Sequence, residues 1–218
     1  MPYAALIDWC GPFHTIEDAC AAVVREGYGE ALYMAIGSRR GQATTHIQYV
    51  GITTDLTTRF NGKHPIQLLL RPKSLRLYVG VVTSQAVAGK KASHHAKNFS
   101  IPLYLAESAL AFLMEIPLNK DKRCNPPKDS IVVVNRWYRD DFATRRRNRA
   151  HTTWPDLVEY DWDEGIGDLA WHGGRRDHIN PDRIQKIQVR ARRDLKKARE
   201  QKARAELALL APETLPDA

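Results

Sequence analysis

Short apolar runs alternate with polar, glycine-containing stretches through the first two thirds of the chain, and their spacing predicts a small sheet. Residues 31–36 form an apolar run of strand-forming residues that ends at Gly37. Residues 46–52 then alternate apolar and polar positions, as a half-buried strand does. A polar loop joins the two, so we expect an antiparallel pair. Further strands are predicted over residues 75–82 and 130–134.

Capping residues and helical spacing predict the helices between these strands. Either Thr53 or Thr54 is placed to cap a short helix over residues 55–60, and a second short helix follows a proline. A longer helix is expected over residues 102–116, where Pro117 stops it. Its residues are apolar nearly all round, so we expect it to be central and buried.

The two ends of the chain predict different additions to this sheet. Near the start, a short helix over residues 19–24 is expected to cover one sheet edge. Near the other end, a small hairpin is followed by Asn180 and Pro181, a strong start for a long helix. The predicted fold class is α+β: a small mixed sheet flanked by helices, a small β-hairpin unit and a long basic C-terminal helix. The expected segments are an N-terminal helical extension (1–29), a central domain (30–130), a strand with basic linker and hairpin (131–178), and the basic C-terminal helix and tail (179–218).

Charge suggests the kind of partner. The formal net charge is +8 and the pI is about 9.5, which favours a polyanion such as DNA, although other acidic partners fit the charge equally well. Residues 183–204 hold ten Lys or Arg against two acids. This helix is also interpretable as a solvated face, or as one half of a coiled coil in a homodimer. The candidate DNA-binding residues are the cations Lys90, Lys91, Arg145, Arg146, Arg147, Arg190, Arg193 and Lys197.

The cysteines and the hydropathy of the chain indicate its cellular compartment. The three cysteines form no metal-ligand spacing, and their odd number predicts reduced thiols. The first ten residues include Asp8 and lack a basic stretch, so we expect no secretory signal. No apolar run is long enough to cross a bilayer. We therefore expect a cytoplasmic protein with no membrane partner.

One carboxylate lies where a core does not need it. On a helix, Glu107 shares a face with Leu110 and Ala111. An ionised carboxylate among such neighbours is costly unless it meets a cation, a metal or hydrogen-bond donors. Arg59 is one candidate partner and a divalent ion is another. A purely structural Arg59–Glu107 ion pair is the competing interpretation.

Two tyrosines precede Arg59 on the predicted strands. Tyr33 lies in the first strand and Tyr49 in the second. A buried tyrosine usually buries its ring and hydrogen-bonds through its hydroxyl. In a catalytic interpretation, one hydroxyl helps to deprotonate an attacking water. Taken singly, each of these residues fits a structural role better than a catalytic one.

Taken together, these residues resemble the GIY-YIG endonuclease family, which is named for two short motifs on adjacent strands. The first motif is represented by Ala31-Leu32-Tyr33, which keeps only the tyrosine, and the second by Tyr49-Val50-Gly51. The arginine, glutamate and asparagine that follow in the family match Arg59, Glu107 and Asn119. The order of strands and helices expected above agrees with the small domain of that family.

The resemblance covers roughly residues 30–125 and implies hydrolysis of DNA phosphodiester bonds with one divalent metal. It implies that Glu107 holds this metal, for which magnesium (Mg2+) or manganese (Mn2+) is suited. It further implies that Arg59 stabilises charge on the phosphoryl group, and that Tyr33 or Tyr49 orients or deprotonates water.

The family often has a further basic residue shortly after the arginine, and here Lys63 and His64 are the candidates. Either one assists the reaction or merely contacts phosphate. Asn119 is expected to brace the site or the water shell of the metal. If the resemblance holds, the two tyrosines, Arg59 and Glu107 should face one concave surface, with Glu107 open to a metal. The rival hypotheses are a nucleic-acid-binding protein with a decayed nuclease site, and a structural domain whose Arg59–Glu107 contact is only an ion pair.

Overall fold

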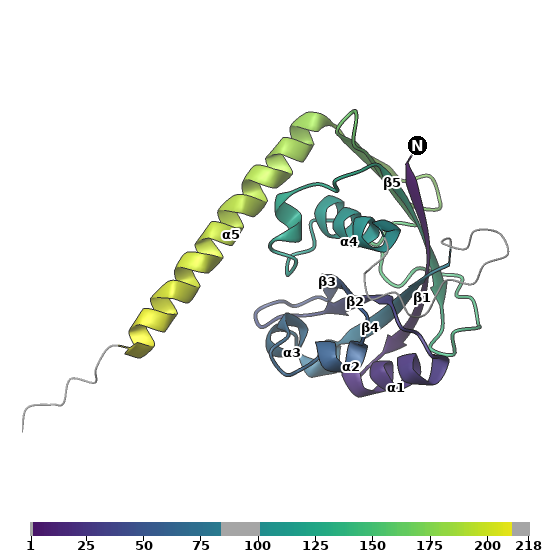
Figure 1. Ribbon diagram of the computed structural model, residues 1–218, viewed down its shortest axis with the longest axis horizontal. Coiled ribbons are helices and arrows are strands. Elements are labelled where there is room, and N and C mark those ends of the chain that lie inside the picture. The colour runs from purple at the N-terminus through teal and green to yellow at the C-terminus, as the bar shows by residue number, and fades with distance from the viewer. Residues whose placement is uncertain (1, 84–100, 211–218) are drawn as a thin grey trace, which may run out of the picture.

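The computed structural model describes residues 2–83 and 101–210, and within them the chain forms one curled, mixed sheet with helices on both faces (Figure 1). In Figure 1, α4 lies on one side of the first four strands and α1, α2 and α3 lie on the other. In chain order the elements are β1 (Tyr3–Phe13), α1 (Ile16–Glu26), β2 (Ala31–Gly37), β3 (His46–Thr53), α2 (Leu56–Arg59), α3 (Pro65–Leu69), the 3-10 helix η1 (Pro72–Ser74), β4 (Arg76–Val82), α4 (Ile101–Leu113), the 3-10 helix η2 (Lys122–Cys124), β5 (Ile131–Tyr138), β6 (Leu157–Asp161), β7 (Ile166–Ala170), β8 (Arg176–Ile179) and α5 (Pro181–Leu210).

The sheet has eight strands in the order β3-β2-β4-β1-β5-β6-β7-β8, so it is larger than the small sheet predicted from the pattern. β1 pairs with β5 in parallel, and every other neighbouring pair is antiparallel. The α+β class is therefore confirmed. The hairpin of β6 and β7 forms as expected, but it is no separate unit, because β6 pairs with β5 and continues the same sheet.

The sequence predicts no strand before residue 30, yet β1 occupies the middle of the sheet between β4 and β5. Alternate residues of β1 are buried: Ala5, Ile7 and Trp9 are at most 1% exposed. The alternation is hidden in the sequence, because Ala4 and Leu6 at the intervening positions are apolar as well. Asp8, at the next intervening position, accepts two hydrogen bonds from Arg136 on β5, at 2.6 and 2.7 Å.

The predicted strands at β2, β3 and β4 are confirmed to within one residue at each end, whereas three helix details differ. Asp55, rather than Thr53 or Thr54, caps α2 by accepting from the next turn. The first helix, α1, packs on a face of the sheet against β4 and β1 instead of covering an edge. α4 ends at Leu113 because Glu115 takes a left-handed conformation with φ of 50°.

Two hydrophobic cores lie on opposite faces of the sheet. The helix α4 lies in the first core, where it meets Trp9, Trp154 and the apolar residues of β5 to β8. Its residues are buried nearly all round, as predicted. The second core joins α1, α2 and α3 to the opposite face of β2, β3 and β4. Tyr33 and Tyr49 belong to the second core, so the sheet directs both of them toward α2 and α3.

The helix α5 begins as predicted, with the Asn180 side chain accepting from the N–H of Arg183 at 3.0 Å. Its apolar residues Ile184, Ile187 and Ala191 dock on the body of the same chain. The helix then continues beyond the body as a projecting arm (Figure 1). Among the residues described, no helix combines the length and apolar character needed to cross a membrane. Cys10, Cys20 and Cys124 are buried free thiols.

Candidate active site

The two tyrosines lie against each other because of the register between β2 and β3. Tyr33 is paired with Gly51, and the Tyr33 and Tyr49 rings stack with centroids 5.7 Å apart. A Cβ atom on Gly51 would lie 2.5 Å from the Tyr33 hydroxyl oxygen and 2.8 Å from the Tyr49 ring. The glycine of Tyr49-Val50-Gly51 therefore provides the space that the Tyr33 side chain occupies.

Arg59, the last residue of α2, joins both tyrosines. Its Nε donates to the Tyr33 hydroxyl at 2.9 Å, and its Nη2 donates to the Tyr49 hydroxyl at 3.4 Å. For its Nη1, no partner is found among the residues that the structure describes. The hydrogen bond to Tyr33, and to a smaller extent the one to Tyr49, raises the pKa of Arg59, which therefore stays cationic. Arg59 is thus held by hydroxyl groups and does not form the ion pair with Glu107 that the structural interpretation required.

His64 supports the same cluster from α3. Its Nδ1 accepts the N–H of Ile66 at 3.3 Å as the helix cap, and its Nε2 lies 3.1 Å from the Tyr33 hydroxyl. This pairing assigns the ring proton to Nε2, which donates to Tyr33. Burial, together with the charge of Arg59, lowers the pKa of His64 from 6.5 to about 4. His64 is therefore a neutral positioning group, while the neighbouring Lys63 is exposed to solvent.

The environments of the two tyrosines differ. Tyr33 is fully buried and accepts hydrogen bonds from both Arg59 and His64. Burial raises the pKa of the Tyr33 hydroxyl above its ordinary value of 10, so this group stays protonated. Tyr49 is 9% exposed, and its hydroxyl accepts the longer hydrogen bond from Arg59. Of the two tyrosines, Tyr49 is therefore the less buried.

Glu107 is buried on α4 and is paired with a residue that the sequence did not single out. Its Oε2 lies 2.9 Å from the Nζ of Lys122, and the N–H of Ile52 on β3 also donates to its carboxylate. Burial raises the pKa of Glu107, while the charges of Lys122 and then Arg59 oppose that rise. Glu107 therefore lies within electrostatic reach of the tyrosine cluster, but it is closed by Lys122 and not open as predicted.

Asn119 uses both ends of its carboxamide on one residue of β3. Its Oδ1 accepts the N–H of Val50 at 2.9 Å, and its Nδ2 donates to the Val50 carbonyl at 2.6 Å. Since β3 is the edge strand, these bonds satisfy backbone groups that no neighbouring strand pairs. Asn119 thus braces the strand that carries Tyr49.

The donor set limits which metal this region is suited to bind. In residues 2–83 and 101–210 no three or more His, Cys, Asp or Glu side chains gather in a group that would hold a metal. Glu107 supplies a single hard oxygen donor group, since the groups that act on it are Lys122, Arg59 and the N–H of Ile52. With Lys122 displaced from Glu107, such a set would suit Mg2+ or Mn2+ that keeps several water ligands, and it does not fit a zinc site.

The predicted DNA-binding arginines at 145–147 divide into two kinds. Arg145 and Arg147 are exposed. Arg146 instead lies half-buried and donates to the Gly11 carbonyl at 3.1 Å and to the Tyr78 hydroxyl at 3.2 Å, so it holds the loop in place. Two hollows, of about 630 and 550 Å³, adjoin this loop and share residues 145–148 in their walls. Lys90 and Lys91 fall outside the described residues.

The cations on α5 also differ in availability. Arg190 forms an ion pair with Glu115 at the end of α4. Arg193 and Lys197 are exposed on the helix as it leaves the body. The exposed pair therefore remains free to contact a polyanion, whereas the charge of Arg190 is already neutralised within the fold.

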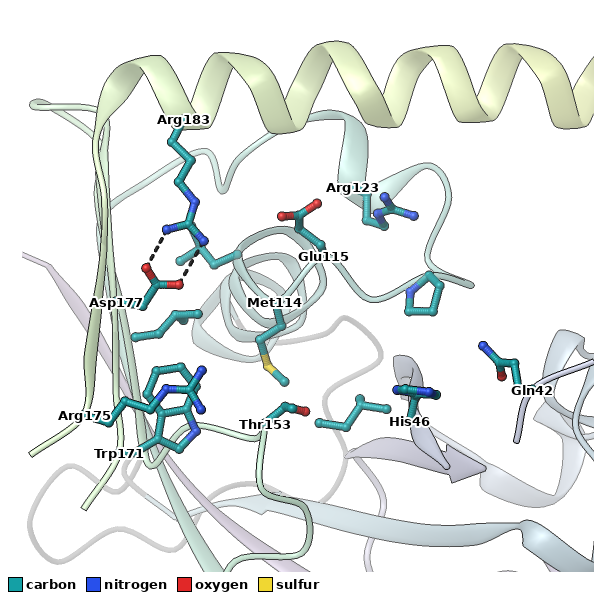
Figure 2. Close-up of a pocket in the computed structure, with 14 residues that line it drawn as sticks. Gln42, His46, Met114, Glu115, Arg123, Thr153, Trp171, Arg175, Asp177 and Arg183 are labelled. Atoms are coloured by element: carbon teal, nitrogen blue, oxygen red, sulfur yellow. Dashed lines mark hydrogen bonds and ion pairs between the residues drawn. The ribbon is translucent and has the colours of Figure 1, made fainter. Parts of the chain in front are cut away.

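A separate hollow of about 470 Å³ lies beneath α5, between the end of α4, β3 and the strands β7 and β8 (Figure 2). Figure 2 shows Arg183 and Asp177 facing each other across two hydrogen bonds, of 2.5 and 2.9 Å. Arg175 lies over the Trp171 ring at 4.1 Å. None of the predicted catalytic residues lines this hollow. The tyrosine cluster and this hollow are therefore distinct features.

Searches against protein-family models, curated proteins and solved structures found no match for the chain.

Proposed function

We propose that the chain is a metal-dependent DNA endonuclease of the GIY-YIG type, which hydrolyses phosphodiester bonds. The observation that carries this proposal is the cluster in which Arg59 hydrogen-bonds both Tyr33 and Tyr49, with His64 behind Tyr33 and Glu107 within electrostatic reach. A fold needs no such arrangement of polar groups around one arginine at the rim of a core.

In this proposal Arg59 binds the scissile phosphate. Two of its nitrogens are fixed by tyrosine hydroxyls, so the guanidinium is oriented before substrate arrives. Its Nη1 then donates to a phosphoryl oxygen and stabilises the charge that develops during attack. Preorganisation of this kind avoids the cost of ordering a long side chain during the reaction.

Tyr49 orients the attacking water, because it is the less buried of the two tyrosines. Tyr33 and His64 are positioning residues: the buried hydroxyl of Tyr33 aligns Arg59, and the neutral His64 ring aligns Tyr33. Glu107 would hold the cation, which would supply Lewis-acid stabilisation of charge on the phosphodiester. Lys63, exposed beside His64, contacts a neighbouring phosphate.

Affinity for DNA comes from the exposed cations outside the cluster. Arg145 and Arg147 on the loop, and Arg193 and Lys197 on the arm of α5, are placed to contact phosphates. Such contacts position the duplex without reading its sequence.

A second candidate function is nucleic-acid binding without cleavage. The contact between Lys122 and Glu107 favours it, because a carboxylate that already has an ammonium partner does not need a metal. In this alternative the tyrosine cluster is a remnant that stabilises the second core.

Incubation of supercoiled plasmid with the purified chain tests the two proposals. We expect nicked or linear DNA with Mg2+ or Mn2+, no cleavage with chelator, and a loss of at least 100-fold in Glu107→Gln. Glu115→Gln is the matched control, since Glu115 is a carboxylate just beyond the same helix and pairs with an arginine. If the wild-type chain retards DNA on a gel but leaves it intact with both metals, the endonuclease proposal is overturned and the binding function stands.

A further inference from the structure

Lys122 is held in place by two different groups. Its Nζ lies 2.9 Å from Glu107 Oε2 and 3.8 Å from the centroid of the Tyr104 ring. The side chain of Glu107 is 8% exposed and that of Lys122 is 30% exposed. A charge-assisted hydrogen bond and a cation–π contact therefore keep the ammonium on the one buried carboxylate of the cluster.

This contact places a cation of the chain itself on the carboxylate to which the proposed function assigns the metal. An ammonium group and a divalent cation repel each other strongly when they share one carboxylate in a poorly solvated site. The groups found to act on the charge of Glu107 are Lys122, Arg59 and the N–H of Ile52, and none of them is a carboxylate that would neutralise the added charge.

We propose that Lys122 is a built-in competitor of the divalent metal, whose ammonium group must leave Glu107 before the metal binds. The inference rests on the proposed function only in that Glu107 is taken as the metal ligand. It assigns Lys122 a regulatory role: the residue stabilises the buried carboxylate without metal and lowers the affinity for metal.

The surrounding structure allows this exchange without unfolding. The backbone of η2 is anchored because the N–H of Arg123 donates to the Asn119 carbonyl at 3.0 Å, and because α5 packs on η2. Only the side chain of Lys122 needs to move, and its flexible stem is partly exposed. The position of Glu107 is meanwhile kept by the N–H of Ile52.

Isothermal titration of the full-length chain with Mn2+ at pH 8, without DNA, tests the competition. The variants are Lys122→Met, which keeps the length of the stem but removes the charge, and Glu107→Gln. We expect Lys122→Met to bind Mn2+ about tenfold more tightly than the wild-type chain, the size of one charge-assisted hydrogen bond. Glu107→Gln should abolish binding. Lys120→Met removes an exposed charge from the same segment and should leave the affinity unchanged.

Equal or weaker Mn2+ binding by Lys122→Met overturns the competition. Equal gains in Lys122→Met and Lys120→Met also overturn it, because they would reflect the net charge of the segment alone. The plasmid assay on the same proteins separates the two proposals. If Lys122→Met binds Mn2+ more tightly but the wild-type chain does not cleave the plasmid, the competition stands and the nuclease proposal is refuted. If the wild-type chain cleaves the plasmid but Lys122→Met does not change the affinity for Mn2+, the nuclease proposal stands and the competition is refuted.

Discussion

The carboxamide of Asn119 hydrogen-bonds both the N–H and the carbonyl of Val50, and it thereby takes the place of a neighbouring strand at the open edge of β3. Val50 lies between Tyr49 and Gly51, so this contact steadies the strand that carries the proposed water-orienting hydroxyl. The carbonyl of Asn119 also accepts the N–H of Arg123, next to Lys122. One residue therefore connects the strand of the tyrosines to the segment that pairs with Glu107.

Replacing Asn119 by aspartate should destabilise the fold. The carboxylate of Asn119→Asp keeps an acceptor for the Val50 N–H but faces the Val50 carbonyl without a donor, which should cost about 2 kcal/mol of unfolding free energy. Urea denaturation at pH 8 measures this loss. Asn61→Asp is the control, since Asn61 is exposed and accepts a hydrogen bond from the N–H of Lys63, which aspartate also does. Equal losses in the two variants would show that the Val50 contact has no special weight.

The two tyrosines should respond differently to removal of the hydroxyl. Tyr33→Phe leaves Arg59 Nε and His64 Nε2 without their acceptor in a buried place, so we expect a loss of about 1–3 kcal/mol in stability. Tyr49→Phe should change stability by well under 1 kcal/mol but slow cleavage about 100-fold. Denaturation and plasmid cleavage on the same preparations check both expectations. Unimpaired cleavage by Tyr49→Phe would assign the water-orienting role elsewhere.

His64 should make stability depend on pH in a defined window. Its pKa is about 4 in the folded chain against 6.5 when unperturbed, so the unfolded chain binds the proton more readily. The contribution of His64 to stability is then fully present above pH 6.5 and falls by about 3 kcal/mol as the pH drops to 4. His64→Gln should show a smaller fall over this window, even though loss of the α3 cap lowers its stability at pH 8. Parallel urea midpoints for the two chains from pH 8 to pH 4 would contradict this assignment.

The exposed arginines should govern the salt dependence of DNA binding. We expect Arg145→Ala/Arg147→Ala to weaken binding and to reduce the slope of log K against log salt by about 2, since each arginine releases about one counterion. Arg183→Gln/Arg190→Gln changes the net charge equally, yet both of these arginines already have carboxylate partners. Fluorescence anisotropy with a labelled duplex at several salt concentrations measures both slopes. A change in slope that is as large in the control pair would show that net charge, and not this loop, determines binding.

Local patterning predicted much of the fold because the responsible interactions are short in sequence. Apolar alternation placed β2 and β3, and Asn180 with Pro181 placed the start of α5. Tyr33, Tyr49 and Arg59 were also expected to face one surface, and the structure joins them by hydrogen bonds. Gly51 allows the two tyrosines to lie together, since its missing side chain leaves room for the Tyr33 hydroxyl.

The sequence by itself determined that β3 is half-buried and that α4 is buried nearly all round, because periodicity records the burial of a face. It did not determine which distant element covers that face. Only the tertiary structure placed β1 between β4 and β5, where Arg136 neutralises Asp8. Only the tertiary structure paired Glu107 with Lys122 in place of Arg59, whose guanidinium is held by the tyrosines. The physical reason is that a charge takes whichever partner the packed fold brings within hydrogen-bonding distance, and no local pattern contains that distance.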